Sequence, residues 1–184
     1  MSIEIEKKYR LEPADRGAVI AALNEVGAEF IGREFEENTI YSNANLRQTG
    51  AIVRIRKTEK RSLLTFKRRI ENAFDVKQQI EHETEISDPE AVEAIIAELG
   101  LQPVIVYEKY RDTWKFRSVE LVLDEVPFGD YMEIEGSITA IKEAEILLGI
   151  DDLETEHETY PRLTGRLGTR SGDLVEARFA KEQE

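Results

Sequence analysis

The chain has 184 residues, 41% hydrophobic and 34% charged, with 38 acidic and 25 basic residues, a formal net charge of -13 and no cysteine. This length suits one domain with an apolar core, and the acidic balance argues against nucleic acid or an anionic membrane as the main partner. The lack of cysteine excludes disulfides, thiolate zinc sites and a cysteine nucleophile. With no signal-peptide core and no apolar run of membrane-spanning length, the sequence predicts a cytoplasmic protein.

In chain order, expected strands are interrupted by three well-marked helices. The helices are expected over 14–26, 88–99 and 137–148, because each has an apolar stripe at helical spacing and a glycine directly after its end. Short connections between strands favour antiparallel hairpins, and the whole pattern predicts an α+β domain around an antiparallel sheet or barrel. The expected strands alternate in polarity or are rich in β-branched and aromatic residues, and they cover 3–11, 31–42, 50–57, 62–70, 78–87, 103–117, 119–127 and 130–135.

Charged residues fall on one face of most of these strands. Because side chains alternate across a strand, residues two apart share a face. In a purely structural interpretation this charged face meets water and carries cross-strand ion pairs. The three amphipathic helices, however, need the apolar face for burial, which would turn the charged face inward onto the bore of a barrel. The rows in question are Glu4, Glu6 and Lys8; Arg54 and Arg56; Lys67 and Arg69; Glu83 and Glu85; Lys109 and Arg111; and Glu133 and Glu135.

Such an interior indicates the type of ligand. Burying many charges without counter-ions is costly, so a charged ligand and metal ions would be needed to balance them. Arginine and lysine side chains suit phosphate oxygens, and Glu-x-Glu pairs supply the hard oxygen ligands that magnesium and manganese prefer. Basic side chains together with metal-binding carboxylates are typical of sites that catalyse phosphoryl transfer. The sequence has neither a Gly-x-x-x-x-Gly-Lys loop nor a Gly-rich dinucleotide turn.

Seven segments resemble, in order, the signatures of the CYTH superfamily, the triphosphate tunnel metalloenzymes. The first, Glu4–Lys8, is similar to the family's ExExK signature. The resemblance covers about residues 2–163 and implies an α+β fold in which an eight-stranded antiparallel β-barrel forms a tunnel with helices packed outside. It leaves 164–184 as a C-terminal extension that is loosely attached or forms a short helix. The other segments are Val53–Arg56, Leu64–Lys67, Glu83–Glu85, Glu108–Arg111, Leu123–Glu135 and Thr159–Leu163.

The resemblance also implies roles for individual residues. Glu83 and Glu85 would bind a second metal or orient the basic residues, and the metal would be Mg²⁺ or Mn²⁺. The residues expected to bind the triphosphate are Lys8, Arg54, Arg56, Lys67, Lys109 and Arg111. The residues expected to hold metal are Glu4, Glu6, Glu133 and Glu135, with Asp124 nearby, and those expected to serve catalysis are Glu4, Glu6, Lys8, Glu133 and Glu135.

The implied activity is that of a metal-dependent enzyme acting on a triphosphate. One reaction is that of a class IV adenylyl cyclase, which converts ATP to cyclic AMP and pyrophosphate. The other is that of a triphosphatase acting on ATP, tripolyphosphate or thiamine triphosphate. The motifs do not separate the two, because both reactions use nearly the same protein groups. A non-catalytic sensor of polyphosphate or nucleotides is a further alternative, and the sequence leaves a homodimer open.

Overall fold

The computed structural model describes residues 2–71 and 76–180. All eight expected strands and all three expected helices are confirmed, each within two residues at either end. The strands are β1 (Ser2–Leu11), β2 (Glu29–Ser42), β3 (Ala51–Lys57), β4 (Ser62–Ile70), β5 (Lys77–Ile86), β6 (Gln102–Phe116), β7 (Val119–Val126), β8 (Gly129–Glu135), β9 (Thr169–Ser171) and β10 (Leu174–Ala177). The helices are α1 (Pro13–Glu25), α2 (Ala44–Gln48), α3 (Pro89–Glu98), α4 (Ile138–Leu148) and α5 (Tyr160–Leu167).

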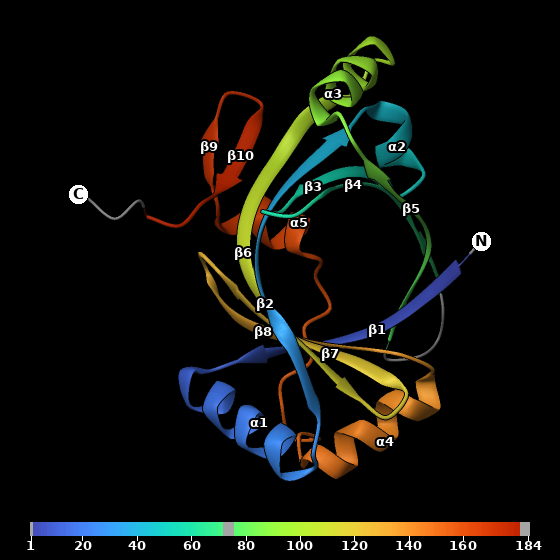
Figure 1. Cartoon of the computed structure of the whole chain (residues 1–184). Helices are drawn as coiled ribbons and strands as arrows, with labels where there is room; N and C mark the ends of the chain where they lie inside the picture. Colours follow the sequence, from blue (N-terminus) through green and yellow to red (C-terminus); the bar gives the residue numbers. More distant parts are fainter. Residues whose placement is uncertain (1, 72–75, 181–184) are drawn as a thin grey trace.

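The first eight strands form a closed ring. Their order is β2-β3-β4-β5-β1-β8-β7-β6, and the additional pairing of β2 with β6 closes it. All eight pairings in the ring are antiparallel, and the sheet curves around an open centre, as Figure 1 shows. The long β2–β6 pair contains two register shifts, between Phe30 and Gly32 and between Ile40 and Tyr41, of the kind that bends a strand. The expected antiparallel barrel is therefore confirmed.

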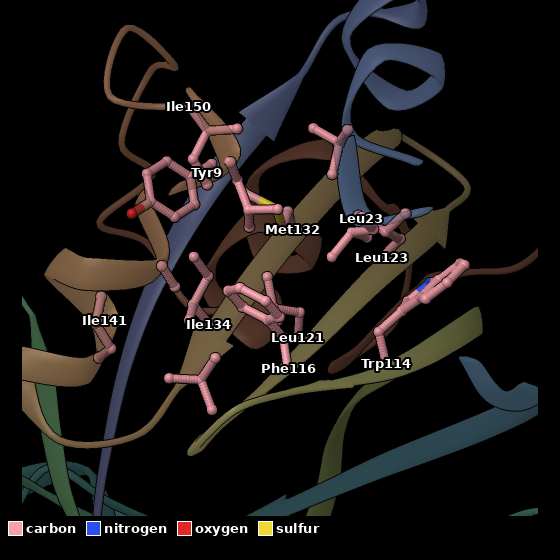
Figure 2. Close-up of a cluster of buried hydrophobic side chains, with 14 of the residues drawn as sticks. Tyr9, Leu23, Trp114, Phe116, Leu121, Leu123, Met132, Ile134, Ile141 and Ile150 are labelled. Atoms are coloured by element: carbon pink, nitrogen blue, oxygen red, sulfur yellow. The ribbon is translucent and has the colours of Figure 1, made fainter. Parts of the chain in front are cut away.

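Helices α1 and α4 cover the outer face of the barrel on the side of β1, β7 and β8 (Figure 1). Beneath them, alternate residues of the strands form the largest apolar core, which Figure 2 shows in close-up. Leu121, Met132 and Ile134 are completely buried there. The side chain of Ser137 caps the first turn of α4, and Gly149 ends the helix in the left-handed conformation at φ 63°. On this side of the barrel the outer face is thus apolar and covered, as the amphipathic helices required.

The C-terminal extension differs from the prediction. The sequence predicted loose attachment or a short helix, whereas α5 is followed by the β9–β10 hairpin, and β10 pairs in parallel with β6 at residues 105–107. This stretch of β6 lies before the part that pairs with β7, so β10 occupies an edge that would otherwise stay open. Val175 and Ala177 are buried with period two, the pattern of a strand, and Arg178 then binds Glu108 at 2.8 Å. The last four residues lie outside the described part.

The short helix α2 is a second element that the sequence did not predict. Its five residues follow Asn43, whose side chain accepts a hydrogen bond from the backbone amide of Leu46. Helix α3 lies at the other end of the barrel from α1 and α4 (Figure 1), where Ile96 packs with Tyr41 and Ile55. Within the described residues, every helix is too short or too polar to cross a membrane.

Candidate active site

The barrel encloses a cavity of about 510 Å³. Each of the eight ring strands contributes at least one side chain to its wall, and the segment Thr159–Pro161 contributes the rest together with Arg61 of the β3–β4 turn. Acidic and basic side chains line the cavity in equal numbers. Most residues of the charged rows therefore face inward, and the interpretation in which the rows meet bulk water is wrong for all of them except Arg69 and Glu85.

Two lysines lie at the centre of this wall. The side chains of Lys8 and Lys109 are each only 1% exposed. The Nζ of Lys8 lies 3.2 Å from Glu133, and that of Lys109 lies 3.2 Å from Asp124. Burial lowers the pKa of Lys8 to about 8, and burial together with the nearby Arg111 charge lowers that of Lys109 to about 8. Both amines carry their charge below that pH, in a place shielded from water.

Arg111 of the cavity wall forms a tight ion pair with Asp124, which is buried behind it. Arg111 donates two hydrogen bonds to Asp124, at 2.7 and 2.5 Å, and a third to Glu133 at 2.7 Å. Burial opposes ionisation of Glu133, but the charges of Lys8 and Arg111 hold its pKa well below the usual value. Asp124 is completely buried and does not line the cavity, so its position makes it a counter-ion for basic residues. Its expected role near a metal is not supported by this position.

Strand β2 supplies buried partners that sequence reasoning missed. Glu36 accepts from Arg56 at 3.1 Å and from Lys109 at 3.3 Å, and Asn38 accepts from the Nε of Arg56 at 3.2 Å. Burial opposes the charge of Glu36, yet the Lys109 and Arg56 charges hold its pKa below its ordinary range. The signal was present in the alternation of β2, because Glu36, Asn38 and Ile40 share the inward parity of the other rows.

Two residues from Arg56 on β3, Arg54 is held by a short chain of hydrogen bonds. Its guanidinium donates to the hydroxyl of Thr65 at 3.1 Å, and that hydroxyl donates to Glu83 at 2.8 Å. Glu83 also accepts directly from Arg54 at 3.4 Å. Of the two roles expected for Glu83, these contacts support orientation of a basic residue. Glu85 is exposed and lies outside the cavity lining, so neither role is supported for it.

Carboxylates gather at one mouth of the cavity. Glu135 lies opposite Glu6 on β1 and opposite Glu120 on β7. The Glu135 side chain remains accessible to solvent at the mouth. Its partial burial there, together with the charges of Glu4 and Glu120, still raises its pKa to about 7. No hydrogen bond or ion pair from another described residue reaches its carboxylate. Glu4, in contrast, accepts from Lys67 at 2.7 Å. This mouth therefore holds more negative charge than its own cations neutralise.

These carboxylates fit a divalent metal ion in kind and in number. Their oxygens are the hard ligands that Mg²⁺ and Mn²⁺ prefer, and a cation would relieve the repulsion that, together with burial, raises the pKa of Glu135. In the described part of the chain, no three acidic or histidine side chains converge on one point. That agrees with magnesium, which usually takes one or two carboxylates and completes its shell with water and substrate phosphates. Glu6 and Glu135, direct cross-strand partners on β1 and β8, are the pair that suits this role best, with Lys77 as a further neighbour 3.3 Å from Glu6.

The structure thus brings nearly all the predicted site residues to one cavity. Only Asp124 and Glu85, of those predicted, are absent from its lining. Lys67 lies at the acidic mouth, bound to Glu4 and to Glu81. Glu36, Asn38 and Thr65 are buried behind the wall as partners of its arginines. The lining itself contains further residues to which the sequence assigned no role in the site, namely Arg61, Gln79, Glu81, Tyr107, Glu120 and Tyr160.

A closed antiparallel barrel with a cavity of paired cations and carboxylates defines the class of protein by its architecture. The family follows from the sequence, because residues 2–161 match the CYTH domain family. The chain belongs to that family, as its ordered motifs predicted.

Individual relatives agree with this assignment. A Methanocaldococcus jannaschii protein named as a putative adenylate cyclase is 30% identical over 151 residues, which cover 79% of this chain and 83% of that protein. A solved structure from Pyrococcus horikoshii has a TM-score of 0.76 at 25% identity and covers 87% of this chain and 98% of its own. A Hippeastrum protein described as a putative adenylyl cyclase with a dominant triphosphatase activity has a TM-score of 0.65 at 18% identity, covering 94% and 99%, and shows the shared fold.

Proposed function

We propose that this protein is a metal-dependent enzyme that hydrolyses a linear triphosphate bound in the barrel. The observation that carries the proposal is the cavity itself, with five buried or nearly buried cations from strands β1, β3 and β6 and a surplus of carboxylates at its mouth. The cations are Lys8, Arg54, Arg56, Lys109 and Arg111.

Stability alone does not account for this arrangement. Buried ion pairs contribute little to the free energy of folding and are often no better than apolar residues of the same volume, because desolvation offsets their attraction. Here the apolar alternative is already present on the same strands, on the face that α1 and α4 cover. A barrel with charged residues inside and apolar residues outside is therefore better explained by the binding of a charged molecule than by stability. A chain of phosphates is the ligand that arginine forks and lysine point charges match best.

In this proposal Arg54, Arg56 and Lys109 bind the phosphate oxygens, with Lys8 and Arg111 beside them and Lys67 at the mouth. Each of these cations is already held by a carboxylate, so it is positioned before the substrate arrives. Such preorganised positive charge stabilises the negative charge that spreads over the transferred phosphoryl group in the transition state. Glu6 and Glu135 would hold Mg²⁺ or Mn²⁺, which when bound supplies further positive charge and activates water.

The reaction itself is displacement at the terminal phosphorus. The oxygen of a water molecule forms a bond to this phosphorus while the bond to the bridging oxygen breaks. Diphosphate then leaves from tripolyphosphate, or a nucleoside diphosphate from ATP, and the proton of water passes to solvent or to a phosphate. Along this path the cavity residues hold the chain in line and exclude bulk water from its oxygens.

Adenylyl cyclase activity is the second candidate, favoured by the name of the Methanocaldococcus relative. In that reaction the ribose 3′-hydroxyl attacks the α-phosphorus and pyrophosphate leaves, so the cavity must also hold adenosine. The aromatic rings of the described cavity wall are those of Tyr107 and Tyr160, which are only 2% and 5% exposed. Lys8 also lies over the ring of Tyr160. Neither ring presents a free face on which a purine would stack, and this favours hydrolysis.

The proposal is tested by incubating the purified protein with tripolyphosphate, ATP and thiamine triphosphate, each with Mg²⁺, with Mn²⁺ and with a chelator. Chromatography then separates released phosphate from cyclic AMP and pyrophosphate. We expect metal-dependent release of phosphate. If cyclic AMP were the main product from ATP, hydrolysis would be contradicted and adenylyl cyclase activity favoured. Tight binding of tripolyphosphate without any turnover would contradict an enzymatic role and favour a sensor.

A further inference from the structure

Tyr160 lies apart from the barrel strands yet contacts the centre of the cavity. It is the first residue of α5, which follows the eight-stranded ring in the chain, and its side chain is almost completely buried while still lining the cavity. The Nζ of Lys8 lies 3.5 Å from the centroid of its ring, and the Nζ of Lys109 lies 5.2 Å from it. Both distances fall within the range of cation–π attraction, which is strongest where the ammonium has lost its water.

The hydroxyl of the same tyrosine reaches a third cation through a carboxylate. It donates a hydrogen bond to the Oδ2 of Asp124 at 2.7 Å. Asp124 holds Arg111 through two hydrogen bonds and Lys109 at 3.2 Å. The burial of Tyr160 and the Asp124 charge raise the pKa of the phenol well above its ordinary value, so the hydroxyl keeps the proton that it donates. One side chain thus touches or indirectly holds three basic groups of the cavity.

The tyrosine is itself fixed by its neighbours. The ring of Tyr131 meets it edge to face at a centroid distance of 5.6 Å, and the ring of Tyr107 lies 5.9 Å away. Helix α5, which carries it, packs against β6 and β10. Mere packing does not explain the polar contacts. Tyr107 and Tyr131 are equally buried, yet among the described residues neither hydroxyl has a hydrogen-bond partner and neither ring faces a lysine.

We propose that Tyr160 is a positioning residue whose ring places Lys8 and whose hydroxyl, through Asp124, places Lys109 and Arg111 against the substrate phosphates. This inference rests on the proposed function, because it assigns those three cations to a bound triphosphate. It also gives α5 a part in the reaction, since the helix delivers the tyrosine that connects cations from two different strands.

Two substitutions separate the two contacts. Tyr160→Phe keeps the ring beside Lys8 and removes the hydrogen bond to Asp124. Tyr160→Leu removes both. Tyr131→Phe is the matched control, because it deletes the hydroxyl of an equally buried tyrosine that has no hydrogen-bond partner among the described residues. Each variant is compared with the wild-type protein in melting temperature, in kcat and KM for tripolyphosphate with Mg²⁺, and in the proton chemical shifts of the Lys8 side chain.

We expect kcat/KM to fall about tenfold in Tyr160→Phe and about a hundredfold in Tyr160→Leu, because small misplacements of groups that bind a transition state have effects of this size. Tyr131→Phe should match the wild-type protein. The Lys8 ε-methylene protons should be shifted upfield by the ring in the wild-type protein and in Tyr160→Phe, and should lose that shift in Tyr160→Leu. If Tyr160→Leu does not fold, the kinetics of Tyr160→Phe alone test the proposal. Its melting temperature should equal that of the wild-type protein.

Two results overturn the inference by itself. One is an active wild-type protein whose folded Tyr160 variants keep wild-type kinetics, and the other is a Lys8 side chain without an upfield shift in the wild-type protein. A wild-type protein that neither binds nor turns over a triphosphate overturns the proposed function, and this inference falls with it. The wild-type assay therefore distinguishes the two failures before any variant is made.

Discussion

The two faces of the same strands have opposite compositions, and β8 shows this within three residues. Met132 and Ile134 point outward into the core beneath α1 and α4 and are completely buried (Figure 2). Glu133, between them, points inward to Lys8 and Arg111. Stability and chemistry therefore alternate along one strand, because period-two geometry sends successive side chains to opposite sides of the sheet.

This contrast has an energetic meaning. Outward residues are apolar, closely packed and stabilising in proportion to the area they bury. Inward residues are charged, and their burial costs about as much as their pairing returns. A substitution on the outer face should therefore change the free energy of unfolding and leave the chemistry of a folded molecule intact. A substitution on the inner face should change the chemistry, and where it leaves a buried partner unpaired it should also lower the free energy of unfolding. Adjacent residues provide the matched pair.

The largest effect on the reaction is expected from Glu135→Gln. This change removes a carboxylate at the acidic mouth that has no counter-ion of its own among the described residues, so metal-supported turnover should fall about 10²-fold or more. The melting temperature should stay the same or rise, since the change relieves repulsion from Glu4 and Glu120. Turnover is measured against Mg²⁺ concentration. Glu85→Gln, on an exposed residue outside the cavity, is the control and should match wild type.

Ile134→Ala tests the opposite face one residue away. Truncating a completely buried isoleucine should cost about 2–5 kcal/mol of unfolding free energy, from lost burial and the cavity left behind. Below its melting temperature, the variant should keep kcat and KM within about twofold, by the alternation of faces. Denaturant unfolding and turnover are measured on the same preparation. A variant that loses turnover without losing stability would break the contrast between the faces.

A pH dependence should appear at the acidic mouth. The pKa of Glu135 is raised from 4.5 to about 7 in the folded protein, so between these pH values the folded state binds the proton and the unfolded state does not. Without metal, the unfolding free energy of wild type should therefore fall, relative to Glu135→Gln, as pH rises from about 4.5 to about 7. Metal affinity should rise over the upper part of that window. If the difference in unfolding free energy between wild type and Glu135→Gln stayed constant with pH, the raised pKa of Glu135 would be contradicted.

The smallest effect is expected from Arg61→Gln. Arg61 is exposed on the β3–β4 turn and lines the cavity, and among the described residues its guanidinium has no ion-pair partner. In a chain of net charge -13, a cation at the entrance should attract an approaching triphosphate. We expect KM to rise about threefold at low salt and kcat to stay unchanged, with the difference shrinking as salt screens the charge. Arg68→Gln, exposed on the adjoining strand β4 but outside the cavity lining, should have no effect.

The contrast between faces could be predicted from the sequence because it depends only on local alternation. Lys8, Arg56 and Glu133 take the inward positions that their parity assigned. The counter-ions could not be predicted in the same way, since they depend on which distant strands meet. Glu36 reaches Lys109 only because the barrel closes between β2 and β6 with these two residues in register.

The C-terminal part shows the same limit more strongly. The alternation of Val175 and Ala177 fits a strand, but only the open edge of β6 makes that strand pair there. Tyr160 belongs to the matched segment Thr159–Leu163, but that match did not indicate what its side chain contacts. Its contacts with Lys8 and Asp124 arise from the packing of α5 against the barrel, which no local pattern encodes.

The most direct test of the inward-facing charges is a crystal structure of the protein with tripolyphosphate and Mn²⁺. The proposed function predicts a phosphate chain inside the barrel in contact with Arg54, Arg56 and Lys109, and an anomalous manganese peak beside Glu6 and Glu135. A phosphate chain bound only on the outer surface, with the ion pairs of the cavity unchanged, would contradict it.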